Sequence, residues 1–313
     1  MNILITGATG FIGRNLLELI STQTNYIPKN ITLISRNLDK FDEHIKNNYK
    51  IIKADLNDLE SLLAAFKNID VVINTAAEVR NQHQLAITNI EGTKNIVNAA
   101  ITNNVKKIIH LSSVGVVGMQ YSLNPVLVDE NAECNPKNEY ERTKLLSENI
   151  LKEASTSKSF DLIILRPTNV FGEHHPLNAL QTILKHISKN KPMLTTKTAT
   201  YNYVYVKDVA ATLVKMIDFH PSQVETYNIG TSMLIKDFIN LINRELKAKS
   251  KVIFIPKFII SLINLLGLKK LYPISNEVNY SDKKLKAIFE YEFGLEKGIY
   301  NTIAYYKSIN GLN

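Results

Sequence analysis

The chain has 313 residues, of which 45% are hydrophobic and 21% charged, as in an ordinary globular protein. This length suits one large core, or a core with a smaller lobe. The formal charge of +8 favours an anionic ligand. The lysines form no run of five like charges and no nucleic-acid module is recognisable, so we expect no nucleic-acid partner.

The cysteine content and apolar runs bear on the compartment. The single cysteine, Cys134, cannot cross-link the fold and points to a reducing environment. The first apolar run, residues 3–5, is cut by Gly7 and Gly10, unlike a signal peptide. The run 258–268 is shorter than the roughly 18–20 residues of a membrane span. Because lysines flank this run, it is either a peripheral membrane contact or, more commonly, a helix of a small lobe. We expect a cytoplasmic protein without stable membrane insertion.

The first half of the chain alternates short apolar runs with segments of helical period. The expected elements are strand 2–6, helix 11–21, strands 31–34 and 50–53, helix 58–66, strand 70–73, helix 85–102, strand 106–111, helix 138–155 and strand 161–165. Such alternation predicts βαβ units and a parallel sheet covered on both faces. The fold class is therefore α/β, a Rossmann-type doubly wound parallel sheet.

After Arg166-Pro167 the alternation stops. A proline-containing segment with a helical stretch is followed by alternating tyrosines at 200–206, a helical pattern at 208–219 and a mostly helical C-terminal part. We expect a nucleotide-binding domain at 1–168, to which 203–230 returns. Residues 169–202 and 231–313 would form a smaller, mostly helical substrate-binding lobe.

A glycine-rich segment, Gly7-Ala8-Thr9-Gly10-Phe11-Ile12-Gly13, joins the first strand to the first helix. Glycines there permit a tight turn and let the backbone approach a pyrophosphate at the helix N-terminus. The G-x-x-G-x-x-G spacing differs from the G-x-G-x-x-G fingerprint. The strand before it and the helix after it nevertheless favour nucleotide binding over a plain turn.

Two polar residues follow the next two strands. Arg36 can accommodate the 2′-phosphate of NADP, whereas an acidic residue there would bind the ribose of NAD. Arginine also stacks on adenine without any phosphate, so NADP is favoured while NAD stays open. Asp55 is placed to bind the adenine amino group, or only to begin a helix-capping turn.

The next chemistry-bearing residues are a serine pair and a Tyr-x-x-x-Lys motif. Ser112-Ser113 ends the fifth strand, and Tyr140 and Lys144 leave the same face of the following helix. A neighbouring ammonium favours the phenolate, so Lys144 should lower the pKa of Tyr140. The serine hydroxyl can hold the reacting oxygen in place.

These residues share one property: each follows a predicted strand. In a parallel sheet such strand ends meet at one edge, where ligands of open α/β sheets bind. The residues at this edge are Gly7, Ser35-Arg36, Asp55, Thr75-Ala76-Ala77, Ser112-Ser113 and Arg166-Pro167.

The ordered motifs resemble those of the extended short-chain dehydrogenase/reductases, specifically the NAD-dependent epimerase/dehydratase family. The resemblance continues through Asn89-Ile90-Glu91-Gly92-Thr93, Arg166–Gly172 and Tyr203–Val209 and covers nearly the whole chain. It implies a catalytic serine at Ser113, an acid/base at Tyr140 and its lysine at Lys144. It also implies a homodimer formed through helices 85–102 and 138–155.

The candidate site follows from the motifs and the resemblance together. The cofactor-binding candidates are Gly7, Thr9, Gly10, Phe11, Ile12, Gly13, Arg36, Asp55, Leu56, Thr75, Ala76, Ala77, Tyr140, Lys144 and Pro167. The substrate-binding candidates are Ser113, Asn169 and Tyr201; Tyr201 could equally pack within a half-buried strand. His174-His175 lacks a spaced third ligand, so no metal is expected.

Departures from the family pattern narrow the expected reaction. Family members that dehydrate sugars carry an Asp-Glu pair where this chain has Val114-Gly115, so dehydration is not expected. Galactose epimerases of this type usually have an acidic residue near the place of Arg36. We therefore expect an NADP-favouring reductase of a nucleotide-linked keto-sugar. The alternatives are a sugar-nucleotide 4-epimerase, a reductase of apolar ketones of the dihydroflavonol or steroid type, and a non-catalytic nucleotide-binding regulator.

Overall fold

The computed structural model describes residues 1–22, 30–119, 121–158, 160–175, 179–265, 272–309 and 311–312. These residues form two compact units. The first comprises residues 1–118, 133–167 and 209–227, and the second 119–132, 168–208 and 228–313.

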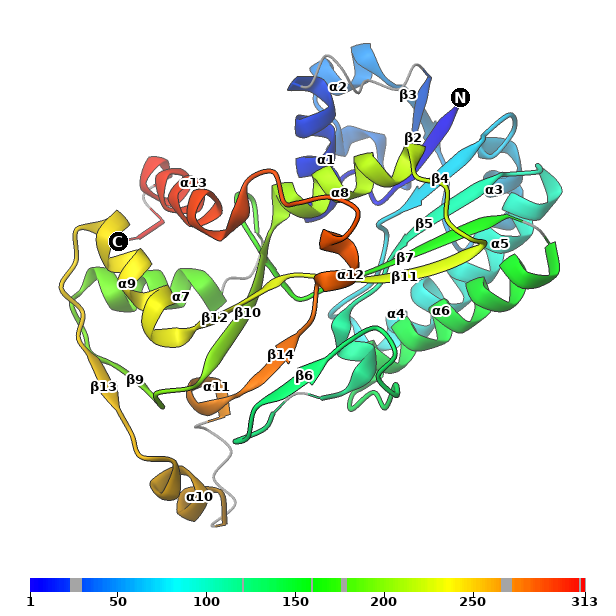
Figure 1. The fold of residues 1–313 in the computed structure, drawn as a ribbon. Helices are drawn as coiled ribbons and strands as arrows, with labels where there is room; N and C mark the ends of the chain where they lie inside the picture. Colours follow the sequence, from blue (N-terminus) through cyan, green and yellow to red (C-terminus); the bar gives the residue numbers. More distant parts are fainter. Residues whose placement is uncertain are drawn as a thin grey trace. The chain divides into compact units, whose positions relative to one another are not determined.

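The first unit is built on a seven-stranded sheet in the order β11-β7-β5-β4-β1-β2-β3 (Figure 1). Its strands are β1 Ile3–Thr6, β2 Ile31–Ser35, β3 Lys50–Lys53, β4 Val71–Asn74, β5 Lys107–Leu111, β7 Asp161–Pro167 and β11 Val224–Ile229. Neighbouring strands from β7 to β3 run parallel. The order reverses direction between β1 and β4, and in such sheets ligands bind at the strand ends beside this reversal. The predicted doubly wound sheet is confirmed.

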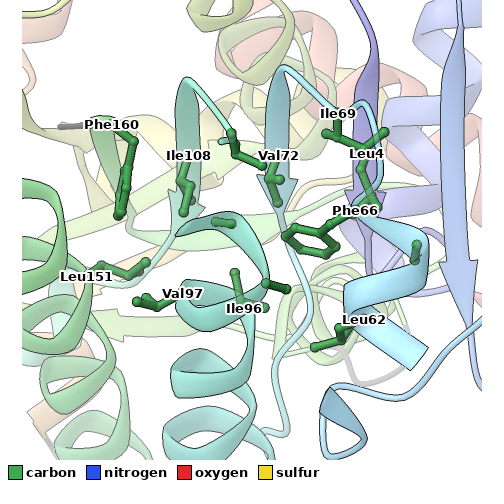
Figure 2. Close-up of a cluster of buried hydrophobic side chains, with 14 of the residues drawn as sticks. Leu4, Leu62, Phe66, Ile69, Val72, Ile96, Val97, Ile108, Leu151 and Phe160 are labelled. Atoms are coloured by element: carbon green, nitrogen blue, oxygen red, sulfur yellow. The ribbon is translucent and has the colours of Figure 1, made fainter. Parts of the chain in front are cut away.

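Helices cover the sheet and bury its apolar side chains. They are α1 Phe11–Thr22, α2 Glu43–Asn48, α3 Leu59–Ala65, α4 Gln82–Ala86, α5 Gly92–Thr102, α6 Glu139–Lys158 and α8 Val206–Asp218. Figure 2 shows one core cluster, in which Phe66 and Ile96 face Leu4, Val72 and Ile108 of the sheet. Truncating a buried phenylalanine such as Phe66 to alanine typically costs about 3–5 kcal/mol.

The predicted helix 85–102 is interrupted in the structure. A π-turn, Ile87–Glu91, separates α4 from α5. The carbonyl of Asn89 accepts hydrogen bonds from the hydroxyls of Thr93 and Ser147, both at 2.6 Å. We attribute the wider turn to these side-chain hydroxyls, which compete with the regular backbone hydrogen bonds of the helix.

The second unit combines helices with three small sheets, in the orders β12-β10-β8, β13-β9 and β14-β6. Its strands are β6 Val126–Val128, β8 Asn169–Phe171, β9 Met193–Thr195, β10 Thr200–Tyr205, β12 Thr231–Leu234, β13 Val252–Phe254 and β14 Val278–Tyr280. Its helices are α7 Ala179–Ser188, α9 Ile235–Leu246, α10 Lys257–Leu265, α11 Tyr272–Ser275, α12 Lys283–Lys286 and α13 Gly294–Ser308. Most of these strands have three or four residues, too few for a period of two to be recognised in the sequence.

No helix within the described ranges is both long and apolar enough to cross a bilayer. The same ranges contain no cluster of three or more His, Cys, Asp or Glu side chains suited to a metal ion.

Candidate active site

The glycine segment forms a tight turn at the N-terminus of α1. Gly7 has φ +70°, and its carbonyl accepts a hydrogen bond of 2.9 Å from the backbone N–H of Gly10. A Cβ on Gly7 would lie 2.7 Å from the backbone nitrogen of Ala76, and one on Gly13 would lie 2.2 Å from the carbonyl oxygen of Gly7. Only glycine fits both positions. The turn brings backbone to the start of a twelve-residue helix, as binding of a dinucleotide pyrophosphate requires.

The loop after β4 is tied to the end of β1. The hydroxyl of Thr75 donates to the carbonyl of Thr6 at 2.7 Å, and the backbone N–H of Ala76 donates to the Thr6 hydroxyl at 3.2 Å. These bonds hold the glycine turn beside the segment Thr75-Ala76-Ala77. Two groups of predicted cofactor ligands therefore meet at the reversal point of the sheet.

The predicted adenosine ligands have partners within the protein. Arg36 is exposed after β2, and its charge acts on Glu78, which follows β4. Burial opposes ionisation of Glu78, but hydrogen bonds from the backbone N–H groups of Arg80, Asn81 and Val79, with the charge of Arg36, lower the pKa of its carboxyl. An acidic side chain near Arg36 was not anticipated from the sequence.

Asp55 begins a turn, one of the two roles expected for it. Its Oδ1 accepts a hydrogen bond of 3.0 Å from the N–H of Asn57, and Asp58 then caps α3. The carbonyl of Leu56 accepts from the side chain of Asn95 at 2.8 Å, which anchors this loop to α5.

A capping arrangement fixes the start of α6, which carries the Tyr-Lys pair. The side chain of Asn138 accepts from the backbone N–H of Glu141 at 2.9 Å. The Glu141 carboxylate in turn accepts from the N–H of Lys137 at 2.7 Å. This resembles a capping box, in which side chains satisfy the free donors of the first turn. Tyr140 lies in that turn and is held with it.

Lys144 is buried one turn further along α6. Its Nζ donates to the carbonyl of Leu111 at 2.7 Å and lies 3.3 Å from Nε2 of His110. Burial lowers the pKa of Lys144 to about 8, against the opposing charge of Glu148. The ammonium is therefore held at the end of β5 and loses its proton far more readily than an exposed lysine does.

The pKa of Tyr140 differs from the sequence-based expectation. Burial raises it to about 12, and the negative charge of Glu141 adds to the increase. The expectation that Lys144 lowers the pKa of Tyr140 took only charge into account. Desolvation of the phenolate is the larger effect here. Tyr140 would need additional positive charge nearby to act as a base.

Ser113 follows β5 and begins a short apolar turn. Its hydroxyl accepts from the N–H of Gly115 at 3.0 Å, which caps the 3₁₀ turn Val114–Val117. Val114 is buried. A Cβ on Gly115 would lie 3.0 Å from Cγ of Glu141 and 3.2 Å from the Ser113 oxygen. The residues directly after Ser113 therefore offer no acid or base.

The sequence did not reveal a buried polar chain that leads to Lys144. The Thr6 hydroxyl donates to Oδ1 of Asn74 at 2.6 Å, and Nδ2 of Asn74 lies 3.0 Å from Nδ1 of His110. His110 links this chain to Lys144. A neutral imidazole has one donor and one acceptor nitrogen, so the contacts at Nδ1 and Nε2 are coupled through the tautomer of His110. Burial, followed by the charge of Lys144, holds the pKa of His110 well below its ordinary value.

A second missed feature is the buried ion pair of Glu148 and Arg166. The Arg166 side chain donates to both carboxylate oxygens, at 2.6 and 2.9 Å. The Ser112 hydroxyl donates to the same carboxylate at 2.6 Å. Arg166 thus lies within β7 as a buried structural residue, whereas the sequence had suggested a position after the strand. Pro167 is the last residue of β7.

The remaining predicted residues belong to the second unit. Asn169 starts β8 and donates to the carbonyl of Asn202 at 3.0 Å. The ring of Tyr201 lies 5.4 Å from that of Phe238, so Tyr201 takes part in packing of the strand. Nδ1 of His174 lies 3.3 Å from the hydroxyl of Tyr305.

Comparisons with known proteins identify the family of this chain. The profile of the NAD dependent epimerase/dehydratase family matches residues 3–230. An N-acetyl-α-D-glucosaminyl-diphospho-ditrans,octacis-undecaprenol 4-epimerase of Escherichia coli O157:H7 is 33% identical over 236 residues, 72% of this chain and 66% of that protein. Cinnamoyl-CoA reductase 1 of Petunia hybrida is 33% identical over 230 residues, 66% of each chain. Each match thus spans about two thirds of the relative's length.

A solved structure supports the fold over the full length. The UDP-glucose 4-epimerase of Thermus thermophilus, in complex with NAD, superposes with a TM-score of 0.73 at 20% identity. The alignment covers 98% of this chain and 99% of that one.

Proposed function

Since the chain belongs to the NAD-dependent epimerase/dehydratase family, we propose that it inverts C4 of a hexose carried on a diphosphate, with NAD as its cofactor. One observation carries the choice of reaction. The Tyr140–Lys144 pair supplies a single acid/base group, while the segment after Ser113 is an apolar turn. Dehydration needs a further acid and base, but oxidation and reduction at one carbon do not.

The glycine turn fits the pyrophosphate, and the exposed ends of β2 and β3 would hold the adenosine. Held by the glycine turn and these strand ends, NAD would supply reversible hydride transfer at C4. Tyr140 would take the proton of the C4 hydroxyl during oxidation and give it back during reduction. Ser113 would hydrogen-bond the same oxygen and keep it aligned with the phenol.

We infer a separate role for Lys144 from the burial of the pair. Because burial raises the pKa of Tyr140 to about 12, the phenolate forms only beside positive charge. We infer that the Lys144 ammonium, one turn further along α6, would supply part of that charge while it remains protonated. With the pKa of Lys144 at about 8, activity should fall as the pH rises through that value.

The choice of NAD departs from the NADP preference that Arg36 suggested. Arg36 could pair with a 2′-phosphate, but the Glu78 carboxylate near it would repel one. The preference for NAD can be tested by measuring the affinities of the wild type, Arg36→Ala and Glu78→Gln for NAD and for NADP. We expect tighter binding of NAD and a gain in NADP affinity for Glu78→Gln. Tighter binding of NADP by the wild type would restore the earlier prediction.

The relatives suggest two carriers for the sugar. A nucleoside diphosphate is the carrier expected from the sequence, and the E. coli relative is named for a polyprenyl diphosphate sugar. The assay should offer UDP-glucose, UDP-N-acetylglucosamine and N-acetylglucosaminyl-diphospho-undecaprenol, with NMR detection of the C4 epimer. Formation of an epimer without net use of cofactor supports the proposal. Stoichiometric oxidation of NADPH by a nucleotide-linked keto-sugar would favour the keto-sugar reductase. Stoichiometric oxidation by an apolar ketone or a cinnamoyl thioester would favour the reductase of apolar substrates.

The expected homodimer, formed through α4–α5 and α6, is part of the proposal. Sedimentation velocity would detect it as a species of twice the chain mass. The cytoplasmic location stays a prediction.

A further inference from the structure

The helix α10 of the second unit exposes the face that helices normally bury. Phe258, Leu262 and Leu265 are 72%, 60% and 83% exposed, and their spacing of four and three residues places them on one stripe. Ile260, on another side of the helix, is fully buried. The helix is thus apolar both toward the protein and toward solvent.

The ribbon that leads to α10 extends this apolar surface. Ile253 of β13 pairs with Leu194 of β9, and both side chains are exposed on the same face of the ribbon. Figure 1 shows β13 running directly toward α10. We call the following exposed side chains the apolar face: Leu194, Ile253, Phe258, Leu262 and Leu265.

Lysines gather at the other end of the same ribbon. The segments 185–198 and 247–265 contain no Asp or Glu. Five of their exposed lysines form what we call the basic rim: Lys189, Lys191, Lys247, Lys249 and Lys251. The two segments are tied together, because the N–H of Lys249 donates to the side chain of Asn190 at 2.6 Å. Lys251 precedes Ile253 by two residues, or about 7 Å.

We propose that the apolar face and the basic rim together dock this protein on the surface of a bilayer that contains anionic phospholipid. Apolar side chains that reach about 5–10 Å below the headgroups, with lysines level with the phosphates, are the usual arrangement of interfacial proteins. The separation of about 7 Å along the ribbon lies within that depth.

The charge distribution selects a membrane over a second copy of the chain. A symmetric contact with the two ribbons running in the same direction would bring the basic rims of two copies together, with no acidic residue in either segment to offset them. An anionic surface instead complements the rim. The inference goes beyond the proposed function and does not rest on it, because docking requires neither cofactor nor sugar.

Flotation of the purified full chain with vesicles tests the proposal. The vesicles would be phosphatidylcholine alone, or phosphatidylcholine with about 30% phosphatidylglycerol, at low and high salt. The apolar-face variant is Phe258→Ser/Leu262→Ser, and its control is Tyr300→Ser/Ile309→Ser, which removes exposed apolar side chains elsewhere in the second unit. The rim variant is Lys249→Gln/Lys251→Gln, with Lys236→Gln/Lys307→Gln as its control.

We expect the wild type to float with the anionic vesicles at low salt and to be released at high salt. Each of the two test variants should lose about tenfold or more in vesicle affinity, while both controls bind as the wild type does. Failure of the wild type to float would overturn the proposal. Equal binding to neutral vesicles would overturn its electrostatic part. Self-association that only the apolar-face variant abolishes, without flotation of the wild type, would assign the face to a second copy.

Discussion

Replacing Glu148 by glutamine should destabilise the first unit far more than loss of an ordinary ion pair does. The carboxylate is fully buried and receives both hydrogen bonds of the Arg166 fork and one from Ser112. Glu148→Gln keeps the shape but leaves the buried guanidinium without its counter-charge. Removing one partner of a buried pair typically costs about 3–5 kcal/mol, which corresponds to a lower Tm by on the order of 10 °C.

The helix α6 provides a matched control for this experiment. Glu139 pairs with Arg142 at 2.6 Å, but both side chains are well exposed. Glu139→Gln should therefore change the free energy of unfolding by about 1 kcal/mol or less. A double change, Glu148→Met/Arg166→Met, should regain part of the lost stability, because the guanidinium is no longer buried without its counter-charge. Urea unfolding measures all of these values. A free energy of unfolding for Glu148→Gln within about 1 kcal/mol of that of the wild type would contradict this prediction.

The same substitution should alter the pH dependence of activity. The charge of Glu148 raises the pKa of Lys144, which burial lowers to about 8. In Glu148→Gln that opposing charge is gone, so Lys144 loses its proton at a lower pH. The alkaline decline of kcat/KM, measured at a temperature where the variant is folded, should move toward neutral pH. An unchanged pH profile of kcat/KM would show that protonation of Lys144 does not control the activity.

Three further predictions concern the turn, the buried histidine and the tyrosine. Gly7→Ala should abolish NAD binding and destabilise the fold, because its Cβ would lie 2.7 Å from the backbone nitrogen of Ala76. Gly294→Ala is the control, since Gly294 has a similar φ of +73° but open space around it, and it should lower the free energy of unfolding by only about 1 kcal/mol. The pKa of His110 is lowered mainly by burial, so stability is full above the ordinary pKa of about 6.5 and should fall by about 1.4 kcal/mol per pH unit below it. His110→Asn should lose that slope in urea unfolding at pH 7.5, 6.0 and 5.0, whereas an identical slope would show that another group is responsible. Tyr140→Phe should bind NAD as the wild type does in calorimetry but lose at least about a hundredfold in kcat; weaker NAD binding with normal turnover would contradict its role.

The central strands of the first unit could be predicted because they are buried, nearly continuous apolar runs, as in β1, β4 and β5. β3 also begins and ends at the expected residues, although its two lysines are exposed. The glycine turn could also be recognised, because the glycines that it needs lie within one short segment of the sequence. The π-turn at Ile87–Glu91 was not, because it depends on a hydroxyl, that of Ser147, far along the chain.

The parts of the site that the sequence missed are contacts between strands and helices distant in sequence. Asn74, His110 and Lys144 come from β4, β5 and α6 and meet only in the folded sheet. The direction of the pKa shift of Tyr140 was wrong for a related reason. Charge can be read from neighbouring residues, whereas the degree of burial depends on the tertiary structure.

The central claim is that C4 is oxidised and reduced again within one site. The most direct measurement follows deuterium placed at C4 of a UDP-hexose or of the corresponding polyprenyl diphosphate sugar, with NAD-saturated protein in ordinary water. We expect the C4 epimer to form with its deuterium retained and no NADH to accumulate, and Tyr140→Phe to slow epimer formation at least about a hundredfold. Loss of the deuterium to water, or its appearance in released NADH, would contradict the account.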